Sequence, residues 1–494
     1  MEVLLSELNE KKRMMIYQLN ALVQQQQNLI SSVVHYGILG PKDGDHFETE
    51  YNICNEHSLQ IKCLEYDLKH LEDEINNVTN VNVEQYGVRS EVGRLEIVLM
   101  HRPGSELRRL TLENLTTLLF DALPNLNHTY ISHNLFADYL RQQSIEVLYV
   151  SDILRETLRN SKLAIRELID GIVKKSLPQV KDHLQLWLEK RDVEQLARDV
   201  IEGVQCNYNE IGQTDIGQIL LKLCPIGDYL VPPLPNLMFT RDSFSIIEDK
   251  VVIHKMAYAA RQNEPLIMSI IFKYYPRFVE HLEVIDWQKH VKNSEATIEG
   301  GDLAYLGNGT LLIGCSERTN DVAIDALAKT MFDLGILKRV IVVGIPKSRD
   351  YMHLDIVMSA VSSCAFTLHG RLATIMEIFE VTPDVINNSC RWTAKGKNVG
   401  DVLENLLGKS LTFYDAKTEK VSIKDQTNCR HNVLAIDEYH IATYSGGDDE
   451  SSITSQMIGH PQFPCTVFSV PTAGLLEGAG GAHCLTNGIR RRSC

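Results

Sequence analysis

The sequence lacks several features that would place it at once in a large class of proteins. It has no run of about eighteen apolar residues, so no membrane-spanning helix is predicted. It is also short of positive charge, because 49 Lys and Arg residues face 64 Asp and Glu residues. Since phosphate binding needs a basic face, we expect neither nucleic acid nor an anionic membrane as a main partner.

The spacing of the cysteines excludes two further classes. The eleven cysteines are scattered, odd in number and without a Cys-x-x-Cys pair, so they indicate neither a disulfide framework nor a structural zinc site. Residues 1–7 carry acidic side chains and no apolar core of the kind found in secretory signals. We therefore expect reduced thiols and a cytoplasmic protein.

The length of 494 residues leaves room for one domain of about 400 residues and an accessory segment. Residues 1 to about 36 place apolar side chains on alternating three- and four-residue steps, and residues 61–78 repeat this pattern after a Gly-Pro break at Gly40. We expect a helical hairpin or coiled coil over residues 1–85. The hairpin either packs against the rest of its own chain or joins chains into a homo-oligomer, and we favour the homo-oligomer.

Residues 86–494 are predicted to form the main α/β domain. Pairs of short apolar strands recur along it, at residues 244–254, 303–313, 356–368 and 432–444. Helical stretches and further strands follow, such as residues 321–334 and 339–343, which gives a repeated strand-strand-helix-strand module. With residues 90–104 the number of modules reaches five. Residues from about 152 to 222 alternate charged and apolar positions at helical spacing, which predicts an inserted helical bundle.

The end of the chain carries the motif Glu477-Gly478-Ala479-Gly480-Gly481-Ala482-His483-Cys484. Glycine lets the backbone approach a ligand closely, so a cysteine directly after such a run is a candidate nucleophile. Packing is the common role of a buried cysteine and is the alternative here. A phosphate-binding loop is not favoured, because no lysine follows the glycines.

Three upstream segments change the balance toward catalysis. They are Asn236-Leu237-Met238-Phe239-Thr240-Arg241-Asp242, Glu299-Gly300-Gly301-Asp302 and Met352-His353-Leu354-Asp355. Taken singly, they are typical of a capped turn, a loop and a buried histidine. Taken in order with the segment that ends at Cys484, they resemble the active-site segments of the arginine deiminase family, which modifies guanidines on the pentein fold.

This resemblance implies both a fold and a reaction. The fold is an α/β, five-bladed propeller of the repeated modules, and the reaction is hydrolysis of L-arginine to L-citrulline and ammonia. The substrate is a small molecule, and neither a cofactor nor a metal ion is implied. Two alternatives stay open: an enzyme that transfers the amidino group or hydrolyses another guanidine compound, and a non-catalytic scaffold that retains the fold.

The resemblance assigns catalytic work to five residues. Asp242 and Asp355 would hold the guanidinium group through paired carboxylate contacts. Cys484 would attack as a thiolate, with its pKa lowered by the bound cation or by an imidazolium. His353 would protonate the departing ammonia and then activate water, and Glu299 would orient it. In an extended segment alternate side chains face the same way, so we expect His353 and Asp355 to enter one pocket.

The resemblance also assigns residues to the amino-acid end of the substrate. Asn236, Arg261 and Arg318 would hold the α-carboxylate, while the backbone carbonyls of Leu119 and Gly480 would take the α-amino group. Solvated charges at helix ends are the alternative for the two arginines.

One departure concerns substrate identity. The family commonly reads Gly-Arg-Gly-Gly where this chain has Gly478-Ala479-Gly480-Gly481, so an arginine often placed near the substrate carboxylate is missing. Residues 485–491 also look closer to amidinotransferases than to the usual ending. The resemblance therefore specifies the reaction more firmly than the guanidine compound on which it acts.

Overall fold

The structure is a computed structural model that describes residues 10–16, 18–19, 21–25, 68, 86–291, 295–384, 386–416, 418–444, 452–459 and 465–494. The chain divides into two compact units, Met1–Gln85 and Tyr86–Cys494. In the first unit residues 10–16, 18–19 and 21–25 are helical, and most of the predicted hairpin lies outside the described residues. None of the described helices has both the length and the apolar character needed to cross a membrane.

Five sheets of the second unit share one topology. Each contains an antiparallel pair of strands and a third strand that runs parallel to one member of the pair. The strands are β20 (Asn487–Arg491), β2 (Leu95–Met100) and β3 (Glu146–Tyr149); β6 (Phe244–Ile247), β7 (Lys250–Ile253) and β8 (Glu283–Ile285); β9 (Leu303–Gly307), β10 (Thr310–Cys315) and β11 (Arg339–Gly344); β12 (Ala360–Ser362), β13 (Ala365–Thr367) and β16 (Thr412–Tyr414); β17 (Leu434–Ala435), β18 (His440–Tyr444) and β19 (Thr466–Val470). Over the described residues none of these sheets closes on itself.

The first sheet joins the two ends of this unit. Strand β20 lies between β1 (Gly87–Val88) and β2, so the last strand of the chain completes a sheet begun by the first. Further strands are β14 (Ile378–Asp384) and β15 (Ser389–Gly396), which extend the third sheet, and the separate pair β4 (Val204–Gln205) and β5 (Tyr229–Val231). Because β20 follows directly after the cysteine motif, the sheet places that motif beside the start of the unit.

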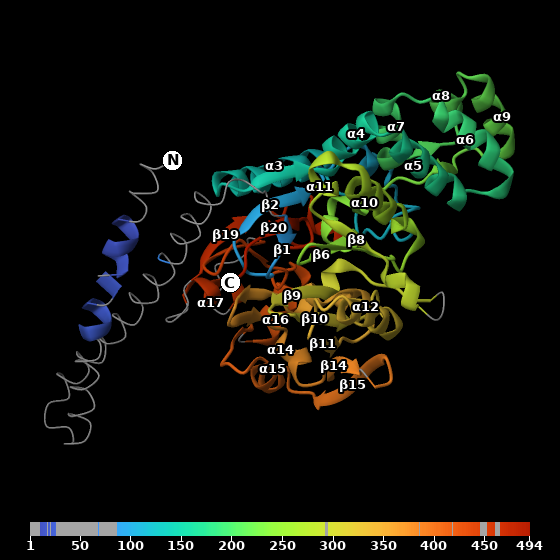
Figure 1. Ribbon diagram of the computed structural model, residues 1–494. Coiled ribbons are helices and arrows are strands. Elements are labelled where there is room, and N and C mark those ends of the chain that lie inside the picture. The colour runs from blue at the N-terminus through green and yellow to red at the C-terminus, as the bar shows by residue number, and fades with distance from the viewer. Residues whose placement is uncertain are drawn as a thin grey trace, which may run out of the picture. The chain divides into compact units, whose positions relative to one another are not determined.

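Helices α4 to α9 lie together in green at the upper right of Figure 1. Apolar positions along them, such as Leu154, Leu168, Leu184 and Val200, are buried in a common core. This core forms because each helix is amphipathic and cannot hide its apolar stripe alone. The helices are α3 (Leu126–Gln142), α4 (Val150–Asn160), α5 (Lys162–Lys175), α6 (Lys181–Glu189), α7 (Val193–Glu202), α8 (Tyr208–Ile211), α9 (Asp215–Leu223), α10 (Asn263–Tyr274), α11 (Pro276–Val279), α12 (Asp321–Asp333), α13 (Leu354–Val357), α14 (Gly370–Ala373), α15 (Val399–Leu407), α16 (Glu419–Thr427) and α17 (Ile453–Ile458).

The hairpin predicted at residues 303–313 is present. Its turn residues Asn308 and Gly309 have φ angles of 51° and 75°, the left-handed conformation that Asn-Gly tolerates in a tight hairpin. The strand predicted at residues 356–359 is wrong, because α13 occupies Leu354–Val357 and β12 begins only at Ala360. The buried carboxylate of Asp302 accepts from the backbone N–H of Leu354 at 2.8 Å, which satisfies the start of this helical turn.

The reason given for expecting His353 and Asp355 in one pocket is also wrong. Asp355 lies in helix α13 and His353 is the residue that precedes the helix, so the two side chains do not share an extended segment. Short apolar runs do not distinguish a strand from a buried helix, and here a long-range hydrogen bond decides between them.

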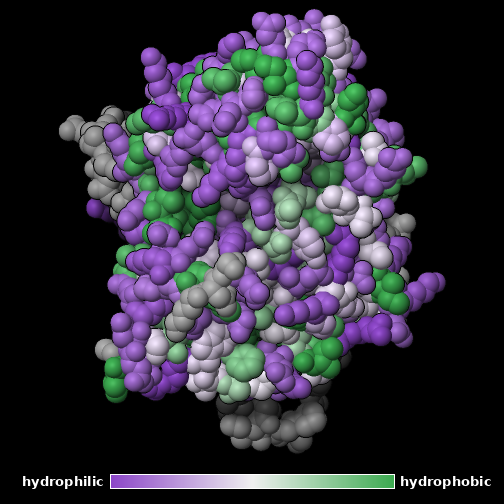
Figure 2. Space-filling view, turned by 90° about the vertical axis from the view of Figure 1, so that its right-hand side faces the viewer, coloured by the Kyte–Doolittle hydropathy of each residue, from purple (hydrophilic) through white to green (hydrophobic). Residues whose placement is uncertain are grey.

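The apolar residues inside the sheets form buried cores, whereas the face in Figure 2 is mainly hydrophilic with separate hydrophobic patches. One core cluster gathers segments that are far apart in the sequence. It contains Leu118, Phe120, Met352, Ala482 and Cys484. The fold therefore packs Leu118, Phe120 and Met352 into the same core as the cysteine motif.

Candidate active site

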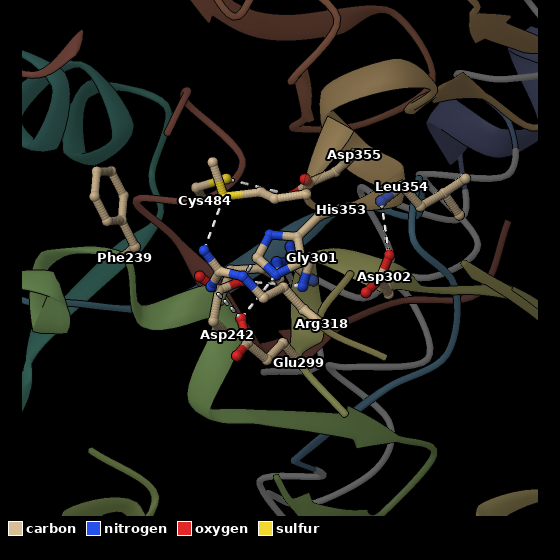
Figure 3. A network of polar contacts seen from close by, with 12 residues as sticks. Phe239, Asp242, Glu299, Gly301, Asp302, Arg318, His353, Leu354, Asp355 and Cys484 are labelled. Carbon is tan, nitrogen blue, oxygen red and sulfur yellow. Dashed lines mark hydrogen bonds and ion pairs between the residues drawn. The ribbon is translucent and has the colours of Figure 1, made fainter. Parts of the chain in front are cut away.

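Separate segments bring the five predicted catalytic side chains to one buried place (Figure 3). Asp242 lies in the short turn Thr240–Ser243, Glu299 precedes the turn Gly300–Asp302, and Cys484 lies in the loop before β20. His353 and Asp355 come from the start of α13. None of the five residues is more than 3% exposed. Their charges therefore act on one another with little screening by water.

The imidazole of His353 lies between two carboxylates. Its Nε2 is 2.9 Å from Oε2 of Glu299, and its Nδ1 is 3.7 Å from Oδ1 of Asp242. Burial lowers the pKa of His353, but Asp242, Glu299 and Asp302 raise it more, to about 9. His353 is therefore protonated at neutral pH and can give a proton to a leaving group.

Asp242 is held by two donors. The backbone N–H of Gly301 donates to Oδ1 at 3.1 Å, and Nη1 of Arg261 donates to Oδ2 at 2.6 Å. Burial raises the pKa of Asp242, but the charges of His353 and Arg261 lower it more, so Asp242 is ionised. Arg261 also donates to Glu264 at 2.8 Å. The structure thus places Arg261 inside the site, between two buried carboxylates.

Cys484 is fixed by two side chains. Its thiol donates to Oδ2 of Asp355 at 3.4 Å, and the side-chain amide of Asn432 donates to the sulfur at 3.1 Å. Oδ1 of Asn432 also accepts from the backbone N–H of Cys484 at 3.0 Å. Burial and the charges of Asp355 and Asp242 raise the pKa of Cys484 well above its ordinary value. An imidazolium does not produce the expected lowering of this pKa, because burial and the nearby carboxylates raise the pKa more. Lowering by a bound cation stays a prediction.

His483 links the carboxylate of Asp355 to that of Glu91. Nδ1 of His483 is 2.8 Å from Oδ2 of Asp355, and its Nε2 is 2.9 Å from Oε1 of Glu91, which also accepts from Arg241 at 3.3 Å. Oδ2 of Asp355 is thereby occupied, whereas its Oδ1 is buried without a hydrogen-bond partner among the described residues. That oxygen is left to accept from a ligand.

Arg318 contacts the same carboxylate as His353, that of Glu299. Its Nη1 donates to Oε2 of Glu299 at 3.0 Å, and its guanidinium carbon is 4.6 Å from the ring centre of Tyr258. Burial raises the pKa of Glu299, but hydrogen bonding to His353 and the charge of Arg318 hold it below its ordinary value. Glu299 is therefore an ionised acceptor for both cations.

Two residues assigned to the amino-acid end of the substrate meet protein groups instead. The side-chain amide of Asn236 donates to the carbonyl of Leu118 at 2.7 Å. The next carbonyl, that of Leu119, accepts from Nη2 of Arg349 at 3.0 Å. The structure thus brings Asn236 and Arg349 to adjacent carbonyls of one segment, and Arg349 reaches it from the turn that precedes α13.

The glycine-rich loop packs tightly against an aromatic ring and an amide. A Cβ on Gly480 would lie 2.4 Å from the ring of Phe239, and one on Gly481 would lie 2.5 Å from the side chain of Asn432. Real Cβ atoms do not make contacts this short, so both positions need glycine. Ala479 lies between Gly478 and Gly480. Its φ is 60°, a backbone conformation that alanine adopts only under strain.

The atoms of Asp242, Glu299 and His353 also lie within 4.8 Å of one another, close enough for a metal ion. Metal binding requires a neutral imidazole. The pKa of His353 is instead raised to about 9 by these carboxylates. The same three groups that could hold a metal ion therefore also favour a proton on His353.

Solved structures similar to this chain include two enzymes of guanidine chemistry. An amidinotransferase from Microseira wollei has a TM-score of 0.48 and 14% identity, and the match covers 83% of this chain and 98% of that one. A mutant dimethylarginine dimethylaminohydrolase from Pseudomonas aeruginosa, complexed with citrulline, has a TM-score of 0.42 and 12% identity over 80% and 99% of the two chains.

The sequence matches are stronger than these structural likenesses. The arginine deiminase of Staphylococcus haemolyticus is 31% identical over 415 residues, which are 82% of this chain and 98% of that protein. The arginine deiminase of Mycobacterium tuberculosis is 31% identical over 413 residues, which are 81% and 97% of the two chains. A family model described as arginine deiminase matches residues 116–491. Because this match spans most of the second unit and includes every predicted catalytic residue, the chain belongs to the arginine deiminase family.

Proposed function

We propose that this protein hydrolyses the guanidinium group of free L-arginine and releases L-citrulline and ammonia. The observation that carries the proposal is a single buried site in which a cysteine, a protonated histidine and ionised carboxylates lie within contact distance. A guanidinium group is a delocalised cation, so the site must hold positive charge and then protonate an amine. Membership of the arginine deiminase family supports the same reaction.

The guanidinium group would bind between Asp355 and Asp242. Among the described residues nothing donates to the buried Oδ1 of Asp355, so this oxygen can accept a hydrogen bond from the substrate. Oδ2 of Asp242 now accepts from Arg261, and the guanidinium of the substrate would take the place of this side chain. The exchange is close to neutral in charge, since one guanidinium replaces another on the same carboxylate.

The amino-acid end of the substrate would be held by the remaining assigned groups. Arg261, once displaced from Asp242, would join Asn236 and Arg318 around the α-carboxylate. The backbone carbonyls of Leu119 and Gly480 would accept from the α-ammonium group. These contacts fix the guanidinium carbon in front of the nucleophile.

The bound cation would offset the carboxylates that raise the pKa of Cys484, so the thiol loses its proton to solvent when substrate binds. The thiolate, stabilised by the amide of Asn432, attacks the guanidinium carbon. His353 then gives its proton to one nitrogen, ammonia leaves, and a cationic thiouronium remains on the sulfur. Neutral His353 takes a proton from water as the oxygen attacks, and collapse of this second adduct breaks the C–S bond. The last proton passes from the product to ammonia, which gives citrulline and ammonium.

We also propose that the five sheets are the blades of a five-bladed ring, and that the site lies where the loops of several blades meet. The shared topology of the sheets and the pairing of both ends of the unit in the first sheet support this arrangement.

We also propose that the protein is cytoplasmic, which its scattered cysteines support.

Residues 1–85 would join chains into a homo-oligomer through apolar seams, supported by the heptad-like spacing. Light scattering on the full chain and on residues 86–494 tests this assembly, and the expected result is fewer subunits per particle after truncation. An unchanged number of subunits would exclude assembly through this segment.

Citrulline formation from L-arginine tests the proposed reaction. We expect the wild-type chain to produce citrulline and Cys484→Ala to lose about 1,000-fold or more of the turnover. Cys429→Ala is the matched control, because Cys429 is a buried cysteine of the same core cluster that takes no part in the chemistry. Absence of citrulline from the wild-type chain would refute the proposal.

Amidino transfer is the second candidate, favoured by Ala479 and by the sequence after the nucleophile. A transferase needs an amine to replace water. Adding glycine or ornithine to the assay should leave the rate of citrulline release unchanged, and a new guanidine product would instead show transfer.

A further inference from the structure

Arg349 lies on the same short segment as the catalytic histidine. It opens the turn Arg349–Tyr351, which leads into His353. Its Nε donates to Oδ1 of Asp121 at 2.9 Å, and its Nη2 donates to the carbonyl of Leu119 at 3.0 Å. The side chains of Arg349 and Asp121 are 35% and 55% exposed. An ion pair this exposed contributes little to stability, so Arg349 can leave its partners at small cost.

Leu119 offers its carbonyl from a strained backbone. Its φ is 64°, in the left-handed region that residues other than glycine seldom adopt. Strain of this kind persists where the surrounding structure holds it in place and is common at ligand sites. Asp121, two residues further on, donates its backbone N–H to the carbonyl of Glu477 at 2.9 Å, so the Leu119 segment lies against the glycine-rich loop that leads to Cys484. The structure therefore shows a cation already bound at this carbonyl.

Arg261 and Arg318, the two arginines assigned to the α-carboxylate, have less freedom to move. Arg261 is tied to Glu264 and Arg318 is tied to Glu299, and neither carboxylate is exposed at all. Removing the arginine from such a carboxylate would leave a buried charge unpaired, which is costly. Arg349 has no such constraint, because the carboxylate of Asp121 can be solvated.

We propose that Arg349 joins Arg261 and Arg318 at the α-carboxylate of the substrate and makes the site select guanidine compounds that retain an amino-acid end. This inference rests on the proposed hydrolysis of a free guanidino amino acid. The α-ammonium of the substrate takes the carbonyl of Leu119 and displaces Arg349. The released guanidinium turns to the α-carboxylate, which lies one carbon away from the ammonium group.

This exchange explains how the site rejects substrates that lack either group. A ligand shifts a conformational equilibrium only through contacts that it makes better in one state. An amine without a carboxylate displaces Arg349 from Leu119 but gives it no new partner. Only a substrate with both groups returns a charged partner to Arg349. The residue thus supplies, from the segment before His353, positive charge that the chain lacks at Ala479.

Kinetics with L-arginine and agmatine, which is arginine without its carboxylate, test the role of Arg349. We expect Arg349→Gln to raise KM for L-arginine about tenfold or more, because a charged contact to the carboxylate is lost, while kcat changes less. kcat/KM for agmatine should stay within about twofold of wild type, since agmatine never makes that contact. Arg371→Gln is the control, as Arg371 is an exposed arginine paired with Glu419 away from the site. An equal loss with both substrates, or no loss with L-arginine, would overturn the inference.

Binding separates failure of this inference from failure of the proposed reaction. L-arginine is titrated calorimetrically into Cys484→Ala and into Cys484→Ala/Arg349→Gln, neither of which needs turnover. We expect about tenfold weaker binding by the double variant, and recovery of affinity when Ala479→Arg is added to it. Arg349-dependent binding by a chain whose wild type makes no citrulline would support the inference and refute the reaction. Equal affinity of the two variants, or no binding by either, would overturn the inference.

Discussion

His353 and His431 are both buried histidines, yet their surroundings shift their pKa values in opposite directions. His353 is 1% exposed and His431 is 0% exposed, so burial opposes protonation of both. The carboxylates of Asp242 and Glu299 reverse this effect and raise the pKa of His353 to about 9. His431 stacks on His369 instead, with ring centres 5.4 Å apart, and burial lowers its pKa to about 3. Charged neighbours, rather than burial, distinguish the proposed catalytic histidine, His353, from His431.

The comparison predicts its largest difference in turnover. His353→Asn should lower kcat for L-arginine about 100- to 10,000-fold, because the proton donor and the base for water are both lost. His431→Asn, the matched variant, should retain kcat within a few-fold per folded molecule. Circular dichroism on both variants confirms that folded protein is compared. Similar losses in the two variants would remove the distinction between the histidines.

The pH profile measures the raised pKa directly. Because kcat/KM reports the pKa values of the free enzyme, kcat/KM for L-arginine should be maintained at neutral pH and fall as pH rises through about 9, by about tenfold per pH unit well above that value. Since the folded pKa exceeds the unfolded value of 6.5, the associated stability is complete below 6.5 and is lost as pH rises toward 9. A kcat/KM that falls instead near pH 6.5 would show that the carboxylates do not raise the pKa of this ring.

Acid unfolding tests the opposite shift at His431. Its folded pKa is depressed, so its stability contribution is complete above 6.5 and is lost as pH falls toward about 3. Within that window the loss is about 1.4 kcal/mol per pH unit for one such histidine. Urea unfolding of His431→Phe should therefore show a weaker dependence on pH than wild type. His128→Phe, which changes an exposed histidine, should keep the wild-type dependence, and a shared slope in all three proteins would contradict the assignment.

The smallest effect is expected where charges pair without burial. Arg159 and Glu194 form an ion pair on the inserted helices, with side chains 60% and 51% exposed. Arg159→Ala should change the unfolding free energy by only about 0–1 kcal/mol, because water and salt screen the pair. Denaturant titration measures the change. A loss near the 3–5 kcal/mol typical of breaking a buried pair would show that exposure is a poor guide to the strength of ion pairs in this protein.

Much of the candidate site could be predicted from the sequence because the proposed chemistry restricts residue types. A nucleophile needs a thiol that a ligand can approach, and Cys484 follows a run of small residues. A cation needs carboxylates, and these occur with a histidine in short motifs that keep their order along the chain. The Asn308-Gly309 turn could be predicted too, since two adjacent residues determine its conformation.

Other contributors gave no local signal. Asn432 lies in an apolar stretch predicted to be a strand, and only the fold brings its amide to the sulfur of Cys484. His483 precedes the nucleophile directly and could have been suspected from that position. Glu91, the partner of His483, lies near the start of the second unit in the sequence, and nothing in the sequence marks it as a neighbour of His483.

The sequence by itself determined which side chains are available for the reaction and which turns and amphipathic segments form locally, because these depend on residues a few positions apart. The tertiary structure alone decided the start of α13 at Leu354, the raised pKa values of His353 and Cys484, and the place of Arg349 on the carbonyl of Leu119. Each of these depends on electrostatic or hydrogen-bonding contacts that act over a few ångströms in space. Residues that make such contacts lie tens to hundreds of positions apart along the chain, so they meet only after the chain has folded.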